Sequence, residues 1–231
     1  MPDITIEGPD GSFGAYLATP ATTPAPGIVV AQEIFGVNQV MRDVCDWLAG
    51  EGFVACCPDI FWRIEPGIQL TDKSEAEWAR AFELFGLFDV DKGIVDLKAT
   101  LSHLRGHEAC SGTAGSIGYC LGGKLAYLMA ARSDADASVG YYGVGLDELL
   151  GEAGGITKPL LLHVASKDQF VPPEAQEKIK AELSGNPQAT LHVYEGNDHA
   201  FARVGGDHYD KAAADLANGR SLEFLRGSLA R

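Results

Sequence analysis

Short apolar runs alternate with longer stretches of helical periodicity along most of the chain. The run at 27–31 is apolar at every position, which is typical of a strand buried on both faces of a sheet. This alternation predicts an α/β fold with a mostly parallel central sheet and helices on both faces. The predicted strands are 13–18, which we expect at an edge of the sheet, 27–31, 53–57, 114–119, 139–142, 159–165 and 190–194.

Capping residues and glycines bound the predicted helices. Asn38 is a candidate N-cap for a helix that ends near Ala49, and Ser74 with Glu77 forms a capping box that opens another. No repeat, low-complexity segment or linker interrupts the pattern, so we expect one compact domain over residues 1–231. The remaining helices are expected from the region after Phe88 to Leu104, and over 121–132, 173–183 and 209–225, while 60–73 is expected to be irregular and 143–157 to be a Gly-rich connection.

Composition and charge limit the classes of partner. The 231 residues are 46% hydrophobic and 22% charged, which is ordinary for a globular protein able to bury a core. Eighteen basic residues against 32 acidic ones give a net charge of -14. Such a surface repels phosphate backbones and anionic lipid, so we expect neither nucleic acid nor a membrane as partner. An anionic small substrate would need a local cationic pocket.

The cysteines and the N-terminus indicate the compartment. Five cysteines occur without a CxxC pair, and no segment approaches the ~18 apolar residues of a membrane span. The first residues lack the basic and apolar regions of a signal peptide. We therefore expect a soluble cytoplasmic protein with reduced thiols. His103 and His107 have i, i+4 spacing, but no acidic ligand pattern accompanies them, so we expect no metal site.

The sharpest local motif is 118–123, GYCLGG, at a predicted strand-to-helix turn. It has the context of the G-x-S-x-G nucleophile elbow, with Cys120 in the serine position. The Leu121 amide and the following helix start would favour a negative sulfur or oxyanion there. Two other interpretations stay open: a tightly packed turn with a buried cysteine, or a phosphate loop, although Leu125 stands where that loop needs Ser or Thr.

Two further residues follow in the order nucleophile, acid, histidine that is typical of α/β-hydrolases. Asp168 comes three residues after the predicted strand 159–165, and His199 lies in a polar loop after the last predicted strand. Taken alone, Asp168 could equally be an ordinary turn residue, and His199 an ordinary surface histidine. Together, each just past a strand, they predict a Cys120–His199–Asp168 triad.

With these residues in place, the chain resembles the dienelactone hydrolase (carboxymethylenebutenolidase) family within the α/β-hydrolase superfamily. The likeness runs over nearly the whole chain, and the QEIFG block with the cysteine elbow is its most specific part. The matching stretches are 32–38, 118–123, 139–145, 167–172 and 199–203.

The resemblance implies a cofactor-free Cys-His-Asp hydrolase of a cyclic enol-lactone, with maleylacetate as product. It gives Glu33 the role of helping to remove the thiol proton of Cys120 when substrate binds. It places the oxyanion between the backbone amides of Ile34 and Leu121. We expect a small lactone or ester as partner, and a monomer.

The substrate-binding positions match the family only in part. One of two arginines that bind the substrate carboxylate in well-known members matches Arg203, but the other matches Trp78. Arg80 lies ~200° around the helix and points elsewhere. Trp78, Phe82 and Phe85 share one helix face, which is either core or pocket lining, and Tyr142 is a further expected substrate contact. Ala200 stands where those members have a serine.

These departures affect the predicted substrate more than the predicted reaction, because they lie at substrate-binding positions and not in the triad. The sequence predicts a cysteine-dependent hydrolase of an enol-lactone or related ester, with a carboxylate-bearing substrate if Arg203 binds it. One alternative is a general carboxylesterase or thioesterase on the same scaffold. Another is a non-catalytic binding or redox-sensing protein in which Cys120 is only an oxidisable thiol.

Overall fold

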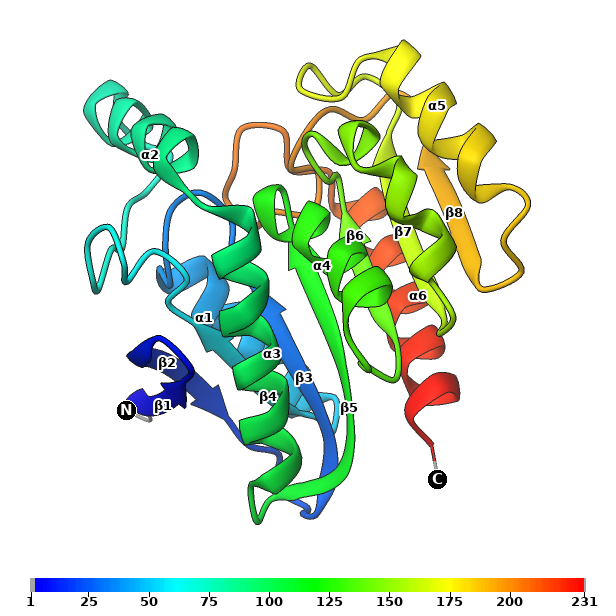
Figure 1. Cartoon of the computed structure of the whole chain (residues 1–231). Helices are drawn as coiled ribbons and strands as arrows, with labels where there is room; N and C mark the ends of the chain where they lie inside the picture. Colours follow the sequence, from blue (N-terminus) through cyan, green and yellow to red (C-terminus); the bar gives the residue numbers. More distant parts are fainter. Residues whose placement is uncertain (1–2, 231) are drawn as a thin grey trace. The chain divides into compact units, whose positions relative to one another are not determined.

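The computed structural model of the chain describes residues 3–230. They form two compact units, 3–115 and 116–230, and the boundary between the units falls inside strand β5 (Cys110–Tyr119). In both units, helices pack against the strands (Figure 1). The α/β class predicted from the alternation of apolar runs and helical periodicity is therefore confirmed.

The first unit is built on four strands in the order β1-β2-β4-β3. Of these, β1 and β2, like β2 and β4, are antiparallel, whereas β3 and β4 are parallel. Helix α1 packs on β2 and β4, and α3 packs on β1, β3 and β4. The elements are β1 (Asp3–Gly8), β2 (Gly11–Ala18), β3 (Ala25–Ala31), α1 (Gln39–Gly50), β4 (Val54–Pro58), α2 (Glu75–Leu87) and α3 (Val90–Gly106).

The second unit is built on parallel strands in the order β5-β6-β7-β8. Because all four run in one direction, their carboxyl ends meet at one edge of the sheet. The chain segments that follow β5, β7 and β8 at this edge carry Cys120, Asp168 and His199. The other elements are α4 (Leu121–Arg132), β6 (Ser138–Tyr141), η1 (Leu146–Glu148), η2 (Leu150–Gly155), β7 (Leu160–Ala165), α5 (Pro173–Leu183), β8 (Ala189–Tyr194) and α6 (Lys211–Leu229).

The local signals of helix starts are confirmed. The Asn38 side chain accepts a hydrogen bond from the Met41 amide at 3.2 Å, as an N-cap of α1 should. Ser74 accepts from the Glu77 amide at 3.3 Å and donates to the Glu77 carboxylate at 2.9 Å, so the two residues form the start of α2 together. Strand β4 is buried at every position, as its unbroken apolar run predicts.

Two predictions about single elements were wrong, and one strand was missed. Residues 13–18 are not an edge strand, because β1 pairs with β2 along its whole length. Strand β1 was not predicted, since only Ile6 of its alternating residues is fully buried. Tyr142, predicted as the end of a strand, lies just beyond β6 with φ at 38°. Within 143–157, the glycine-rich connection contains the short helices η1 and η2.

No helix within residues 3–230 is both long and apolar enough to cross a membrane. The expectation of one domain over residues 1–231 stays a prediction.

Candidate active site

Cys120 occupies a strained turn between β5 and α4. Its φ of 56° and ψ of -116° are unusual for a residue with a side chain. The Cys120 amide donates to the Tyr141 carbonyl at 3.1 Å, and the Cys120 carbonyl accepts from the Gly123 amide at 3.0 Å. A Cβ atom at Gly123 would lie 2.3 Å from the Tyr141 carbonyl oxygen, so only glycine fits there. The turn therefore has the geometry expected of a nucleophile elbow.

Asp168 and His199 form a buried hydrogen-bonded pair. His199 Nδ1 donates to Asp168 Oδ2 at 2.8 Å. The His199 side chain is 8% exposed and the Asp168 side chain 1%. The other carboxylate oxygen, Oδ1, accepts from the Phe170 amide at 2.8 Å. With both oxygens held, the carboxylate fixes the plane of the imidazole and the tautomer that leaves Nε2 available.

The third member of the predicted triad interacts with His199 directly. The Cys120 and His199 side chains share a hydrogen bond, and Cys120 is 9% exposed. Burial disfavours the charged imidazole, but the Cys120 charge and the hydrogen bonds to Asp168 and Cys120 outweigh it and raise the pKa of His199 to about 10. The imidazole of His199 therefore favours its charged form next to the Cys120 sulfur.

Aromatic rings enclose the imidazole on two sides. The ring centroids of Tyr142 and Phe170 lie 5.0 and 4.9 Å from that of His199, both in edge-to-face geometry. The Tyr142 hydroxyl is buried and has no hydrogen-bond partner among residues 3–230. Burial also raises the pKa of Tyr142 well above its usual value, so the hydroxyl is a neutral donor. Sequence reasoning expected Tyr142 at the site but gave Phe170 no role, although it lies only two residues after Asp168.

A second buried network joins β6, β7, β8 and α6 of the same unit. His163 contacts the Tyr194 hydroxyl at 2.7 Å through Nδ1 and the Ser221 hydroxyl at 2.9 Å through Nε2. Ser221 also contacts the Tyr141 hydroxyl at 2.6 Å. Burial lowers the pKa of His163 to about 3, so the ring is neutral. The burial of His163 agrees with a place in the core.

The remaining predicted residues of the second unit are Leu121 and Arg203. Leu121 is the first residue of α4, so its amide belongs to the helix start that has no intrahelical acceptor. Arg203 is 5% exposed, and burial lowers the pKa of its guanidinium to about 10. The Arg203 amide donates to the Ala200 carbonyl at 2.9 Å. This hydrogen bond closes a tight turn that begins directly after His199.

Glu33 and Ile34 belong to the first unit, in the loop that follows β3. They are 3% and 5% exposed. A buried carboxylate is costly unless it is held by partners, so burial of Glu33 argues against a solvated loop glutamate. Their loop is buried at every position from 32 to 38.

The predicted aromatic face of α2 is only partly formed. Trp78 stacks on Phe82 with centroids 5.5 Å apart and meets Phe35 edge-to-face at 5.0 Å. Phe82 is nevertheless 48% exposed, and Phe85 is half-buried one turn on. Arg80 pairs with Glu65 and Glu83 at 2.5 Å each.

Among residues 3–230, no group of three or more His, Cys, Asp or Glu side chains could hold a metal ion. The His103 and His107 rings lie 6.1 Å apart, and His107 caps the end of α3 instead of continuing it.

Comparisons with known proteins agree with this geometry. The sequence profile of the dienelactone hydrolase family matches residues 13–229. An Azospirillum brasilense protein named "Putative carboxymethylenebutenolidase" is 56% identical over 232 residues, which cover 99% of this chain and 100% of that protein. The carboxymethylenebutenolidase of Pseudomonas putida is 43% identical over 223 residues, covering 96% and 94% of the two chains.

A solved structure supports the same family. The crystal structure named "Putative Dienelactone Hydrolase from Klebsiella pneumoniae subsp. pneumoniae MGH 78578" superposes with a TM-score of 0.86 at 27% identity, covering 96% of each chain. The chain therefore belongs to the dienelactone hydrolase family and is a hydrolase of ester or lactone bonds.

Proposed function

We propose that the protein is a cysteine-dependent hydrolase of an enol-lactone or a closely related ester. The observation that carries this proposal is the Cys120–His199–Asp168 arrangement, in which a strained, buried thiol shares a hydrogen bond with an imidazole held by a carboxylate at 2.8 Å. The likeness to carboxymethylenebutenolidases supports the lactone as substrate class.

The mechanism follows from the three side chains. The Cys120 thiolate attacks the carbonyl carbon, and the amides of Leu121 and Ile34 donate to the oxyanion that forms. Collapse of the tetrahedral intermediate breaks the ring C–O bond and leaves a thioester on Cys120, whose acyl chain carries the enolate oxygen; this oxygen takes up the proton that left the thiol. His199 then removes a proton from water, and the hydroxide attacks the thioester. The acid is released and the thiol is restored without any cofactor.

Glu33 is proposed to assist the first step by helping to take the thiol proton. Its 3% exposure supports a specific role over that of a solvated loop residue. A resting thiol that is deprotonated only when substrate binds would resist oxidation better than a permanent free thiolate.

Arg203 is proposed to bind a carboxylate on the substrate. The protein carries a net charge of -14, so an anionic substrate is repelled at long range and needs one directed cation. A buried guanidinium four residues after the histidine base fits this role.

A carboxylesterase or thioesterase acting on a less polar substrate is the alternative. The Trp78, Phe82 and Phe35 rings favour it, because a face of stacked aromatic rings stands where well-known relatives have an arginine. A cytoplasmic location, a monomeric state and the absence of nucleic-acid and membrane partners stay predictions from the sequence.

The test compares turnover of a carboxylate-bearing enol-lactone, a neutral lactone and an activated aryl ester. The wild-type protein, Cys120→Ala and the matched thiol control Cys110→Ala are measured on each substrate. We expect Cys120→Ala to lose several orders of magnitude in rate while Cys110→Ala, at a half-buried free cysteine, stays active. Full activity of Cys120→Ala would refute the cysteine mechanism, and preference for the neutral ester would favour the alternative substrate class.

A further inference from the structure

The loop over residues 32–38 is buried at every position, although it has no regular secondary structure over most of its length. Loops usually lie on the surface, because water can then satisfy their backbone groups. A buried loop needs protein partners for its amides and carbonyls instead. Whatever supplies these partners also fixes where Glu33 and Ile34 lie.

The partners come from the segment 59–70, which follows β4. The Leu70 amide donates to the Phe35 carbonyl at 2.8 Å, and Asn38 Nδ2 donates to the Leu70 carbonyl at 2.8 Å. At the start of the segment, the Ile60 amide donates to Gln32 Oε1 at 3.4 Å. The segment thus holds the loop at both ends.

The middle of the loop is in direct backbone contact with the same segment. Gly36 has φ at 79° and forms an isolated antiparallel bridge with Gln69. A Cβ atom at Gly36 would lie 1.9 Å from the Ile68 carbonyl oxygen. Two backbones this close cannot shift independently, so a displacement of the segment displaces the loop.

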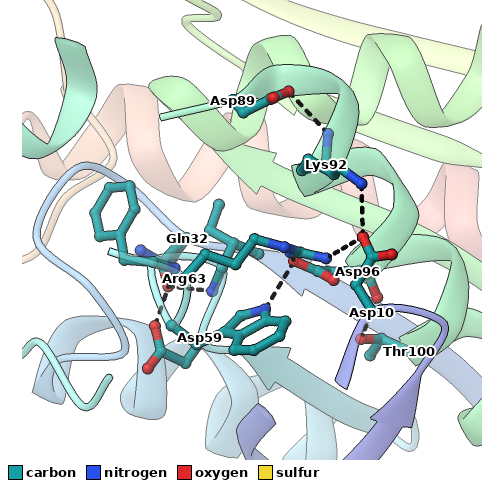
Figure 2. Close-up of polar contacts among 11 residues, drawn as sticks. Asp10, Gln32, Asp59, Arg63, Asp89, Lys92, Asp96 and Thr100 are labelled. Atoms are coloured by element: carbon teal, nitrogen blue, oxygen red, sulfur yellow. Dashed lines mark hydrogen bonds and ion pairs between the residues drawn. The ribbon is translucent and has the colours of Figure 1, made fainter. Parts of the chain in front are cut away.

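The buried carboxylate of Asp59 joins two parts of the segment 59–70 by hydrogen bonds. Asp59 is 6% exposed, and its two oxygens accept from the Phe61 amide at 3.0 Å and the Gly67 amide at 2.7 Å. Figure 2 shows Asp59 and Gln32 in the same polar group. The turn that leads to residues 68–70 is therefore tied to the end of β4 by Asp59.

A separate set of charges anchors the outer part of the segment. Arg63 pairs with the buried Asp96 of α3 and, at 2.8 Å, with Asp10, which also accepts from Lys92 at 2.9 Å (Figure 2). Trp62 Nε1 donates to Asp96 at 2.9 Å. These contacts do not involve Asp59, so loss of the Asp59 bonds leaves the segment attached to α3 and frees chiefly the turn beside the loop.

We propose that Asp59 is a positioning residue of the active site: by closing the segment 59–70 it holds the loop 32–38, and with it Glu33 and Ile34, in place for the reaction. The inference rests on the proposed function, which gives Glu33 and Ile34 their roles. Asp59 itself touches no reacting atom.

The experiment uses Asp59→Asn, which is nearly isosteric. An asparagine side chain has one oxygen, so it can accept from only one of the two amides and points an NH₂ group at the other. We expect kcat to fall by about tenfold to a hundredfold because the loop groups are misplaced, with KM changed much less. Asp46→Asn is the matched control, because it removes a carboxylate that binds Tyr16 at 2.8 Å outside the segment 59–70.

Hydrogen exchange supplies a readout that needs no turnover. In Asp59→Asn the amides of residues 33–36 should exchange faster than in the wild type, while those of α3 keep their protection. A lowered melting temperature with unchanged kcat and unchanged exchange at 33–36 would overturn the inference, since the role of Asp59 would then be structural only. Failure of the proposed function has a different signature, which is full activity of Cys120→Ala whatever Asp59→Asn does.

Discussion

His199 Nδ1 donates a 2.8 Å hydrogen bond to Asp168 Oδ2, although the two residues stand 31 positions apart on the loops after β8 and β7. Parallel strands bring these loops to one edge of the sheet, where Cys120 also lies at the end of β5. The bond sets the tautomer of the base, so the chemistry of the site depends on it.

Replacing Asp168 by asparagine should lower kcat by roughly two to four orders of magnitude. The Asn oxygen would keep the bond to the Phe170 amide, and its NH₂ group would face Nδ1, which favours the tautomer with the proton on Nε2. Steady-state kinetics on an active ester measures the loss. Asp198→Asn is the control, because Asn can still accept from the His199 amide as Asp198 does at 2.7 Å. Near-normal kcat in Asp168→Asn would mean that Asp168 does not orient the base.

The sequence predicts Cys120, Asp168 and His199 at one edge of the sheet because each follows a predicted parallel strand within a few residues. Apolar runs identify strands buried on both faces of a sheet, and the carboxyl ends of parallel strands lie at the same edge. Residues that follow such strands in the sequence can therefore be expected close together in space. Phe170 was not assigned a role, because nothing in a lone aromatic residue distinguishes a ring against an imidazole from one in the core.

Other features depend on contacts that no local pattern encodes. Strand β1 exists because it covers β2, and its own residues are mostly exposed or half-buried. The Asp59 bonds to the Phe61 and Gly67 amides require a turn within a segment that has no periodicity. Such turns are set by tertiary packing, so the sequence analysis assigned this segment only as irregular.

Glu33→Gln should lower kcat without preventing folding. The substitution keeps the size of the side chain and removes the carboxylate that is proposed to take the thiol proton. Circular dichroism and the melting temperature report the fold, and kinetics on the preferred lactone reports the rate. An unchanged kcat, with a crystal structure of the variant showing the substituted side chain where Glu33 lies in the wild type, would rule out the activating role.

Arg203→Ala should act on substrate binding selectively. A charge-assisted hydrogen bond contributes ~1.5–3 kcal/mol, so KM for a carboxylate-bearing lactone should rise roughly tenfold to a hundredfold. A neutral ester should be nearly unaffected, because it offers no carboxylate to the guanidinium. Equal losses on both substrates would show that Arg203 is structural, which its 5% exposure would also allow.

Stability should fall with acid through His163. Its pKa is lowered to about 3, so between the ordinary value of 6.5 and 3 the unfolded chain binds a proton that the native ring does not. The unfolding free energy therefore decreases as the pH falls through this window, by up to ~1.4 kcal/mol per pH unit from this group.

Urea unfolding at several pH values between 6.5 and 4 tests this contribution. His163→Gln should be less stable than the wild type near neutral pH but should show a shallower decline with acid. A slope in His163→Gln equal to that of the wild type would contradict the assignment of a neutral buried ring.

The central claim is that Cys120 carries the acyl group during turnover. Rapid acid quenching of the enzyme with an activated ester, followed by mass spectrometry of the intact protein and its peptides, measures this directly. The account predicts one added acyl group, located on Cys120, which accumulates further in His199→Ala if deacylation slows more than acylation, and which is absent from Cys120→Ala. Wild-type turnover by Cys120→Ala, or an acyl group on another residue that turns over at the catalytic rate, would contradict it.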